Sequence, residues 1–141
     1  MKIYRIEEAT PRVVEALARL LPKLSASAQM PDIVHLERII SNENSHLLVA
    51  DVEGVIAGML SLVLVDIPTG RKAWIEDVVT DEAFRGRGIG RTLVERAIEI
   101  AKEKGAKRIY LTSNPSRKAA HALYAKCGFE CYDTSVFRLI I

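Results

Sequence analysis

The sequence has little net charge and no long apolar run, and each shortage excludes a class of protein. Its 20 basic and 18 acidic residues leave a formal charge of +2, which is too small to predict binding to nucleic acid or to an anionic membrane. No apolar run reaches the roughly 18 residues that a membrane-spanning helix needs. The segment Met1–Arg5 lacks the apolar core of a secretion signal, so we expect a cytoplasmic protein.

The few cysteines and the glycine spacing exclude several familiar sites. Cys127 and Cys131 have no second pair and no histidine cluster beside them, so we expect a cytosolic pair of buried thiols and no bound metal. Gly86-x-Gly88 lacks the third glycine, at position 91, of a dinucleotide-binding fingerprint, and no Gly-Lys-Ser/Thr of a P-loop is present.

The chain contains enough hydrophobic residues to form one folded domain, which we predict to span residues 1–141. Hydrophobic residues make up 49% and charged residues 27%, a balance typical of a folded globular protein. The predicted strands span 3–6, 46–51, 55–66, 74–80, 107–112, 129–132 and 136–140. The predicted helices begin at Thr10-Pro11 and at Pro31-Asp32, and then span 88–104 and 117–127. This order indicates a mixed α/β (α+β) domain.

Local signals mark several boundaries of these elements. Thr10 is a candidate helix cap and Pro11 suits the first helical position, whereas Pro22 should end or kink the same helix. Glu53-Gly54 predicts a hairpin turn. Residues 67–72 contain Pro, Thr and Gly, so we expect a loop there.

The most informative segment runs from Arg85 to Arg91 and reads Arg-Gly-Arg-Gly-Ile-Gly-Arg. Glycines allow a tight turn and close approach of a ligand to the backbone. At the start of a helix such a turn directs free N–H groups and the positive end of the helix dipole toward an anion. The segment therefore predicts a phosphate site, with a glycine-rich loop carrying solvated arginines as the alternative.

Two neighbouring carboxylates, Glu76 and Asp77, interrupt an otherwise apolar strand. Alternation along a strand sends the two side chains to opposite faces of the sheet. A partly buried carboxylate with a raised pKa can accept a proton from a reacting group. Structural hydrogen bonds or ion pairs are the alternative role for either residue.

Two motifs together resemble the GNAT superfamily of acyl-CoA-dependent N-acyltransferases. The family's core motif is Arg or Gln, two residues, Gly, one residue, and Gly or Ala, which here is Arg85-x-x-Gly88-x-Gly90. Its later motif is a helix with Leu-Tyr followed by Gly-Phe, here Leu123-Tyr124 and Gly128-Phe129. The resemblance implies a GNAT fold with a mixed central sheet of about six to seven strands flanked by about four helices.

The resemblance also implies acetyl-CoA as cosubstrate and a role for each matched residue. Glu76 would be the general base, and Tyr124 would give a proton to the leaving thiolate. Many family members have an Asn for the pantetheine arm at the position of Arg117, and Asn114 lies in the preceding loop. The implied cofactor-binding residues are Val78, Val79, Arg85, Gly86, Arg87, Gly88, Ile89, Gly90, Arg91, Asn114, Arg117 and Tyr124.

The resemblance implies a primary amine that attacks acetyl-CoA directly in a ternary complex. We expect a small-molecule amine, because the core fold uses almost all of the compact chain. Arg71 and Lys72, in the predicted loop, and Arg117 favour an amine that also carries a carboxylate or phosphate. A protein or peptide N-acetyltransferase and a non-catalytic acyl-CoA-binding regulatory module are the alternatives, and a homodimer is left open. We expect neither a nucleic acid nor a membrane as partner.

Overall fold

Five strands form one mixed sheet in the order β1-β2-β3-β4-β5. The computed structural model describes every residue from Met1 to Ile141. The first four strands pair antiparallel, and β5 runs parallel to β4. The strands are β1 (Lys2–Arg5), β2 (Ser45–Val52), β3 (Val55–Ile67), β4 (Gly70–Thr80) and β5 (Ile109–Leu111).

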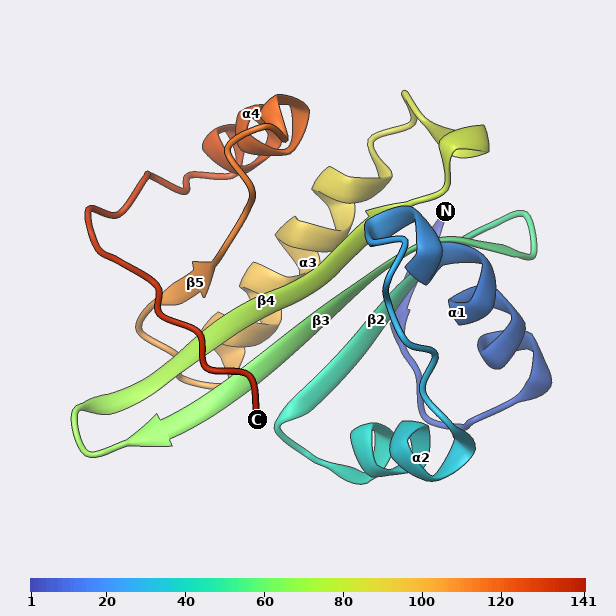
Figure 1. Cartoon of the computed structure of the whole chain (residues 1–141), viewed down its shortest axis with the longest axis horizontal. Coiled ribbons are helices and arrows are strands. Elements are labelled where there is room, and N and C mark those ends of the chain that lie inside the picture. The colour runs from blue at the N-terminus through green and yellow to red at the C-terminus, as the bar shows by residue number, and fades with distance from the viewer.

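Four α-helices cover the two faces of this sheet unequally (Figure 1). Helices α1 (Pro11–Leu24) and α2 (Ile33–Ser41) lie on one face, where α1 packs against β4 and β3 and α2 packs against β2. Helix α3 (Ile89–Glu103) makes the crossover from β4 toward β5 on the other face, as a parallel pair requires. Helix α4 (Lys118–Lys126) packs against α3.

The starts of α1 and α2 follow from local hydrogen bonding. The Thr10 hydroxyl accepts the Val13 N–H at 3.3 Å, with proline at the first helical position, as predicted. The Asp32 carboxylate caps α2 in the same way. Pro22 does not end the helix, which was one of the two outcomes expected there, because α1 continues to Leu24. In the last turn a proline removes only one N–H donor, and the Ser25 N–H still reaches the Leu21 carbonyl.

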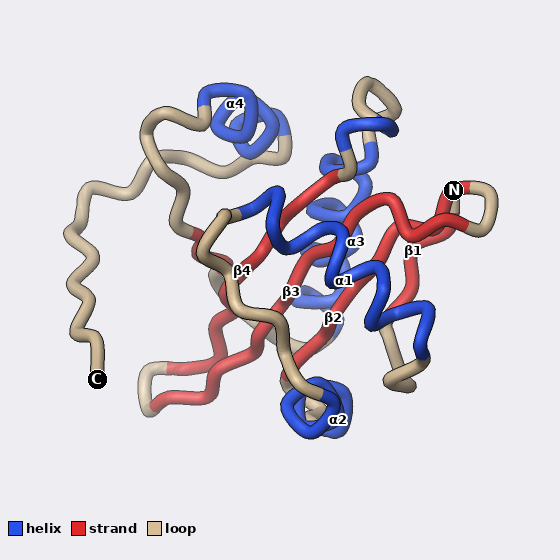
Figure 2. Tube along the Cα trace, turned by 45° about the vertical axis from the view of Figure 1, so that its right-hand side comes forward, coloured by secondary structure: helices blue, strands red, loops and turns tan.

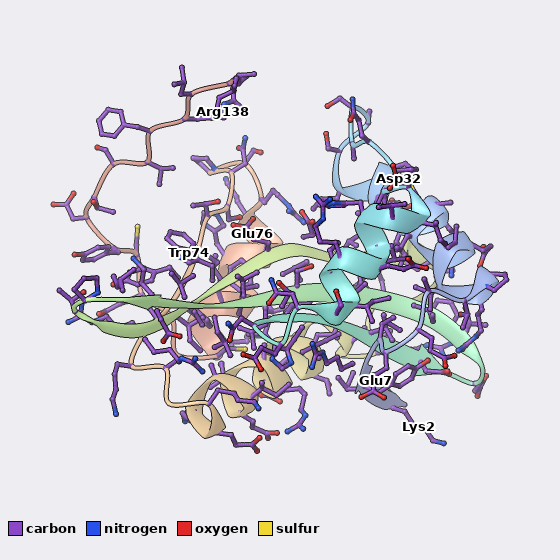
Figure 3. All side chains as sticks on the ribbon, turned by 90° about the horizontal axis from the view of Figure 1, so that it is seen from below. Lys2, Glu7, Asp32, Trp74, Glu76 and Arg138 are labelled. Atoms are coloured by element: carbon purple, nitrogen blue, oxygen red, sulfur yellow. The ribbon has the colours of Figure 1, made fainter.

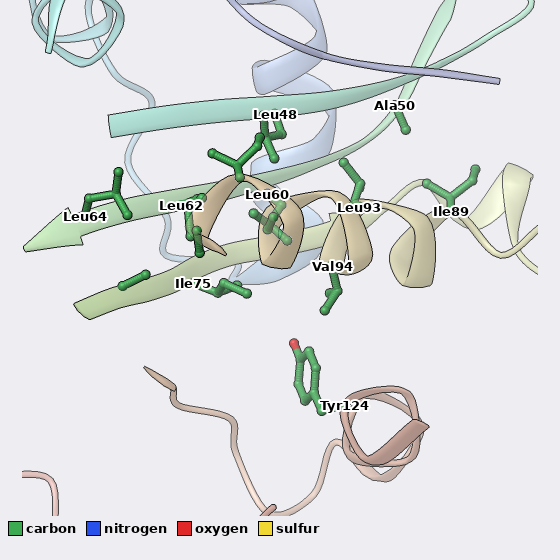
Figure 4. Packing of buried hydrophobic residues seen from close by; sticks show 14 of the residues in the cluster. Leu48, Ala50, Leu60, Leu62, Leu64, Ile75, Ile89, Leu93, Val94 and Tyr124 are labelled. Carbon is green, nitrogen blue, oxygen red and sulfur yellow. The ribbon is translucent and has the colours of Figure 1, made fainter. Parts of the chain in front are cut away.

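Two hydrophobic clusters fill the two sides of the sheet. The α3 side includes Leu60, Leu62, Ile75 and Leu93 (Figure 4). The α1 side contains Ile6, Val13, Ala16, Leu17, Leu20, Leu21, Leu36, Leu47, Val49, Ile56, Met59 and Val79. Burial of these side chains on both faces is the main stabilising contribution, at about 1.5–3 kcal/mol for each large residue.

The β3–β4 hairpin is longer than predicted, so the expected loop over 67–72 was wrong. Strand β4 begins at Gly70, and Ile67 pairs with Gly70 across a two-residue turn. Arg71 and Lys72 therefore lie in the strand. Pro68 and Thr69 do form the turn, but the ladder between the two long antiparallel strands continues as far as Ile67 and Gly70 and confines the turn to two residues.

Residues 129–141 form no strand, although strands were predicted over 129–132 and 136–140 (Figure 2). The sheet accordingly has five strands, and the expected six to seven was wrong. The adjacent edge strand β5 is only three residues long, and β-propensity forms a strand only where a partner supplies the ladder. Several apolar side chains of this segment stay exposed, namely Tyr132, Val136, Phe137, Leu139, Ile140 and Ile141.

Candidate active site

A β-bulge interrupts β4 beside its two carboxylates. Glu76 pairs with Ser61 and Val79 pairs with Met59, so two residues of β4 stand opposite one residue of β3. Asp77 has φ +51°, the left-handed conformation that occurs in one class of bulge. The extra residue moves Val79 to the α1 side of the sheet, whereas Ile75 packs on the α3 side.

Strand β4 also loses its other neighbour at this point. The parallel pairing with β5 covers only Ala73, Trp74 and Ile75. Beyond Ile75, β4 therefore has no strand on its β5 side, and the chain after β5 departs toward α4. The opening between the two strands exposes a backbone edge next to Val78 and Val79, which is where a ligand amide could pair with the strand.

The segment from Gly86 to Arg91 offers a continuous set of free backbone donors. None of its N–H groups donates to a backbone or side-chain acceptor. Gly86 and Gly88 have φ of +79° and +71°, and Gly88 is the N-cap residue of the 15-residue helix α3. A helix N-terminus with unpaired donors is suited to hold an anion.

The three arginines beside this loop are exposed and held by local partners. Arg85 lies 3.7 Å from the Glu82 carboxylate, and Arg91 lies 2.7 Å from the Glu95 carboxylate. The Arg87 guanidinium lies 5.2 Å from the centroid of the Phe84 ring. These weak surface contacts leave the guanidinium groups able to turn toward an anionic ligand.

Gly90 allows α3 and α4 to approach closely. A Cβ atom at this position would lie 3.0 Å from Cδ1 of Leu123, on α4. Glycine at this position therefore leaves room for Leu123 of α4 to pack against the start of α3.

Helix α4 directs the Tyr124 hydroxyl toward α3 and the sheet (Figure 4). The side chain is buried, and its ring contacts Phe129 with 6.0 Å between ring centroids. Burial raises the pKa of Tyr124, the positive charge of Arg117 opposes that shift, and Cys127 adds to it. The hydroxyl is therefore protonated at neutral pH and able to donate a proton.

A groove brings many of the predicted residues together at the opening between β4 and α4. Its lining joins the strand, the arginine-glycine loop and the face of α4 that carries Tyr124. The residues that line it are Lys23, Val78, Val79, Thr80, Glu82, Arg85, Gly90, Arg117, Ala120, Leu123 and Tyr124.

Glu76 lies outside this groove lining, two residues before Val78 on β4. Its side chain is exposed by area, yet the strands beneath it remove part of its hydration. This desolvation raises the pKa of the Glu76 carboxyl, and the neighbouring Asp77 charge raises it further. A carboxylate with a raised pKa is a stronger proton acceptor than an ordinary glutamate.

The two candidates for the pantetheine position differ in placement. Arg117 lines the groove and is the N-cap residue of α4. Asn114 lies outside the lining, and its Oδ1 accepts both the N–H and the hydroxyl of Ser116 at 2.9 and 2.8 Å. The Asn114 amide oxygen therefore closes a turn before α4, and Arg117 is the better placed of the two to meet a ligand.

Sequence reasoning missed the contribution of α1 to the site. Lys23, from the last turn of α1, lines the groove. Its ammonium lies 3.9 Å from Asp81, and Arg19 lies 2.6 Å from the same carboxylate. The spacing of Arg19 and Lys23 by one helical turn was a readable signal, but their partner lies some sixty positions away in the chain.

The fold is of the GNAT type, and the chain belongs to the Acetyltransferase (GNAT) family, whose profile matches residues 10–129. "Probable glucosamine 6-phosphate N-acetyltransferase 2" of Oryza sativa subsp. japonica is 48% identical over 60 residues, which cover 43% of this chain. They cover 34% of the rice protein, so the match spans about a third of that relative.

Solved structures of similar shape cover nearly the whole chain. An acetyltransferase from Agrobacterium tumefaciens str. C58 has a TM-score of 0.86 and 28% identity, with 100% of both chains covered. An aminoglycoside acetyltransferase from an uncultured soil metagenomic sample, in complex with trehalose, has a TM-score of 0.86 and 22% identity. It covers 99% of this chain and 95% of its own, and it supports the fold alone. The GNAT fold expected from the motifs is thus confirmed.

No helix of the chain is both long and apolar enough to cross a lipid bilayer.

Proposed function

We propose that this protein transfers the acetyl group of acetyl-CoA to a small primary amine. The observation that carries the proposal is the run of free N–H donors from Gly86 to Arg91, which opens beside the groove that contains Tyr124. These donors would hold the pyrophosphate of acetyl-CoA, and Arg85, Arg87 or Arg91 would add charge-assisted contacts. The free edge of β4 at Val78 and Val79 would pair with the pantetheine amides.

The raised pKa values of Glu76 and Tyr124 support their assignment as general base and general acid. Glu76 would take a proton from the amine, whose nitrogen then forms a bond to the acetyl carbonyl carbon. A backbone N–H of the bulged strand would stabilise the negative charge that develops on the carbonyl oxygen. The carbon–sulfur bond then breaks, and the Tyr124 hydroxyl would give its proton to the leaving sulfur.

A binding measurement followed by an assay with a panel of amines tests this function. Calorimetry should first show that acetyl-CoA binds the purified protein. Release of free thiol, measured with amino acids, amino-sugar phosphates, polyamines, aminoglycosides and peptides, should then depend on both the amine and the enzyme. Binding without thiol release from any of them would instead identify a regulatory acyl-CoA-binding module. A preference for peptides would assign a peptide N-acetyltransferase.

A further inference from the structure

One face of β4 carries a row of functional side chains beside the bulge. Lys72, Trp74 and Glu76 share this face because strand residues alternate, and Ala73 and Ile75 between them are buried on the α3 side. Figure 3 shows Trp74 and Glu76 on the side of the sheet away from α3. Tyr110 of β5 stands beside Trp74 in the parallel register and continues the row sideways.

Helices α1 and α2 do not cover this part of the sheet. The cluster beneath them uses Leu47, Met59 and Val79, which lie toward the bulged end of β4. Toward the β3–β4 hairpin the same face carries Val63 and Val65, which are only partly buried. The face next to Glu76 is therefore accessible, and it is lined by aromatic and aliphatic groups.

The aromatic rings on this face pack against one another. The ring centroids of Trp74 and Tyr110 are 5.3 Å apart with an interplanar angle of 31°, and Tyr132 lies 6.1 Å from Tyr110. Such rings restrain each other, so they form a preformed apolar surface with little conformational entropy to lose on binding.

The ammonium of Lys72 lies over this aromatic surface. Its Nζ is 6.0 Å from the Trp74 ring centroid and 5.5 Å from the Tyr110 ring centroid, which are cation–π distances. Lys72 forms no ion pair, whereas both oxygens of Asp66 pair with the neighbouring Arg71 at 2.7 Å. Arg71 also reaches the Lys104 carbonyl at the end of α3, on the opposite side of the sheet. Lys72 is thus the basic residue of this pair that lies on the same face of β4 as Glu76.

We propose that Lys72, Trp74 and Tyr110 form the acceptor subsite, and that they select a primary amine with a ring skeleton and a phosphate at its far end. The inference rests on the proposed function, because Glu76 places the reacting nitrogen. Trp74 lies one strand repeat from Glu76, roughly 6.6 Å along β4, and the apolar face of the acceptor ring would pack against it. Lys72, above the same rings, would meet the phosphate as a compact positive charge.

The role of Lys72 is tested by comparing two substrates, with and without a phosphate, in the wild-type protein and in a Lys72 variant. Glucosamine 6-phosphate and glucosamine differ only in the phosphate, so their ratio of kcat/KM measures its contribution. Lys72→Met keeps the aliphatic stem over the rings and removes the charge. We expect the variant to lose about 10-fold or more of the preference for the phosphate, the worth of one charge-assisted contact. Lys107→Met, at an exposed lysine before β5, should retain it.

The aromatic surface is tested with a second pair of amines. O-Phosphoethanolamine carries an amine and a phosphate without a ring. Trp74→Leu and Tyr110→Leu should each lower kcat/KM for glucosamine 6-phosphate by about 10-fold. They should change kcat/KM for phosphoethanolamine by less than about twofold, and the calorimetric Kd for acetyl-CoA should stay unchanged.

The failure of this subsite and the failure of the proposed function give different results. If the wild-type protein binds acetyl-CoA but acetylates no amine of any class, the proposed function is wrong. If it acetylates amines, yet Lys72→Met leaves the phosphate preference intact or Trp74→Leu affects both amines equally, the subsite assignment is overturned. A wild-type preference for glucosamine over its phosphate would overturn it as well.

Discussion

The Arg19 guanidinium lies 2.6 Å from Oδ2 of Asp81 and joins helix α1 to the segment that leads into the Arg85–Arg91 loop. Oδ1 of the same carboxylate accepts the Ala83 N–H at 3.0 Å, and thereby caps the short 3₁₀ helix η1 (Glu82–Phe84). Arg19 also donates to the Ile56 carbonyl of β3 at 2.8 Å. One largely buried carboxylate therefore ties three parts of the chain together at the entrance to the groove.

Asp81→Asn should destabilise the fold by about 1–2 kcal/mol, because Arg19 loses its charged partner. Urea unfolding measures the change, and Glu99→Gln in the exposed Arg96–Glu99 pair should cost less than about 0.5 kcal/mol. The Ala83 N–H, and then Arg19, lower the pKa of Asp81. Its stabilisation is therefore complete above the unfolded carboxyl pKa of about 4 and is lost as the pH falls through the lower folded value. If Asp81→Asn and Glu99→Gln lowered the free energy of unfolding equally, Asp81 would not be the residue that ties α1 to the segment before the loop.

Gly88→Glu should weaken acetyl-CoA binding by about 100-fold, since it places a negative charge among the donors that would hold the pyrophosphate. Gly105→Glu is the matched control. Gly105 follows the other end of α3, has φ +81°, and like Gly88 has open space around it. Both substitutions add the same backbone strain and the same charge. A difference between their calorimetric Kd values for acetyl-CoA therefore reports where the charge lies and not the strain. Equal affinity in both variants would contradict the assignment of the loop.

Tyr124→Phe should lower kcat by about 10²- to 10⁴-fold, the range for loss of a general acid. The affinity for acetyl-CoA should change little, because the ring and its contact with Phe129 remain. Tyr4→Phe removes an exposed hydroxyl that accepts from Arg12, and it should leave kcat unaltered. Steady-state kinetics with saturating acetyl-CoA checks both, and a Tyr124→Phe enzyme of wild-type rate would remove the proton donor from the scheme.

The rate should fall at low pH as Glu76 becomes protonated, with a midpoint above the ordinary glutamate pKa because that pKa is raised. Asp77→Asn removes the neighbouring negative charge, and asparagine tolerates the left-handed conformation of position 77. This variant should move the acidic limb of kcat/KM to lower pH. Glu76→Gln should abolish the limb together with most of the activity. An acidic limb that is identical in all three proteins would belong to another group.

Removal of residues 136–141 should change the free energy of unfolding by less than about 0.5 kcal/mol, because these side chains bury little surface. Phe129→Ala should cost more, about 1–2 kcal/mol, since Phe129 contacts the Tyr124 ring. Thermal or urea unfolding compares the two variants. A larger loss from the truncation would mean that the segment packs in solution as the strand that its sequence favours.

Short-range patterns predicted the elements whose causes are local. The Thr10-Pro11 start of α1 and the Glu53-Gly54 turn follow from capping and from turn geometry. Gly105 after α3 has the positive φ expected of a residue that ends a helix. The Arg85–Arg91 loop lies at the start of α3 as predicted, because glycine spacing and the apolar face of the helix are both readable along the chain.

Long-range pairing decided the rest, because it depends on partners distant in the chain. The amino acids alone made 129–140 look like two strands, but no ladder partner is available for them in the structure. A period of two cannot foresee the bulge at Asp77, which sends Val79 to the face opposite Ile75. The sequence by itself determined the family, the loop and the candidate acid and base. Only the tertiary structure placed Lys72 above Trp74 and sent Arg71 to the other face, since strand register sets which side chains share a surface.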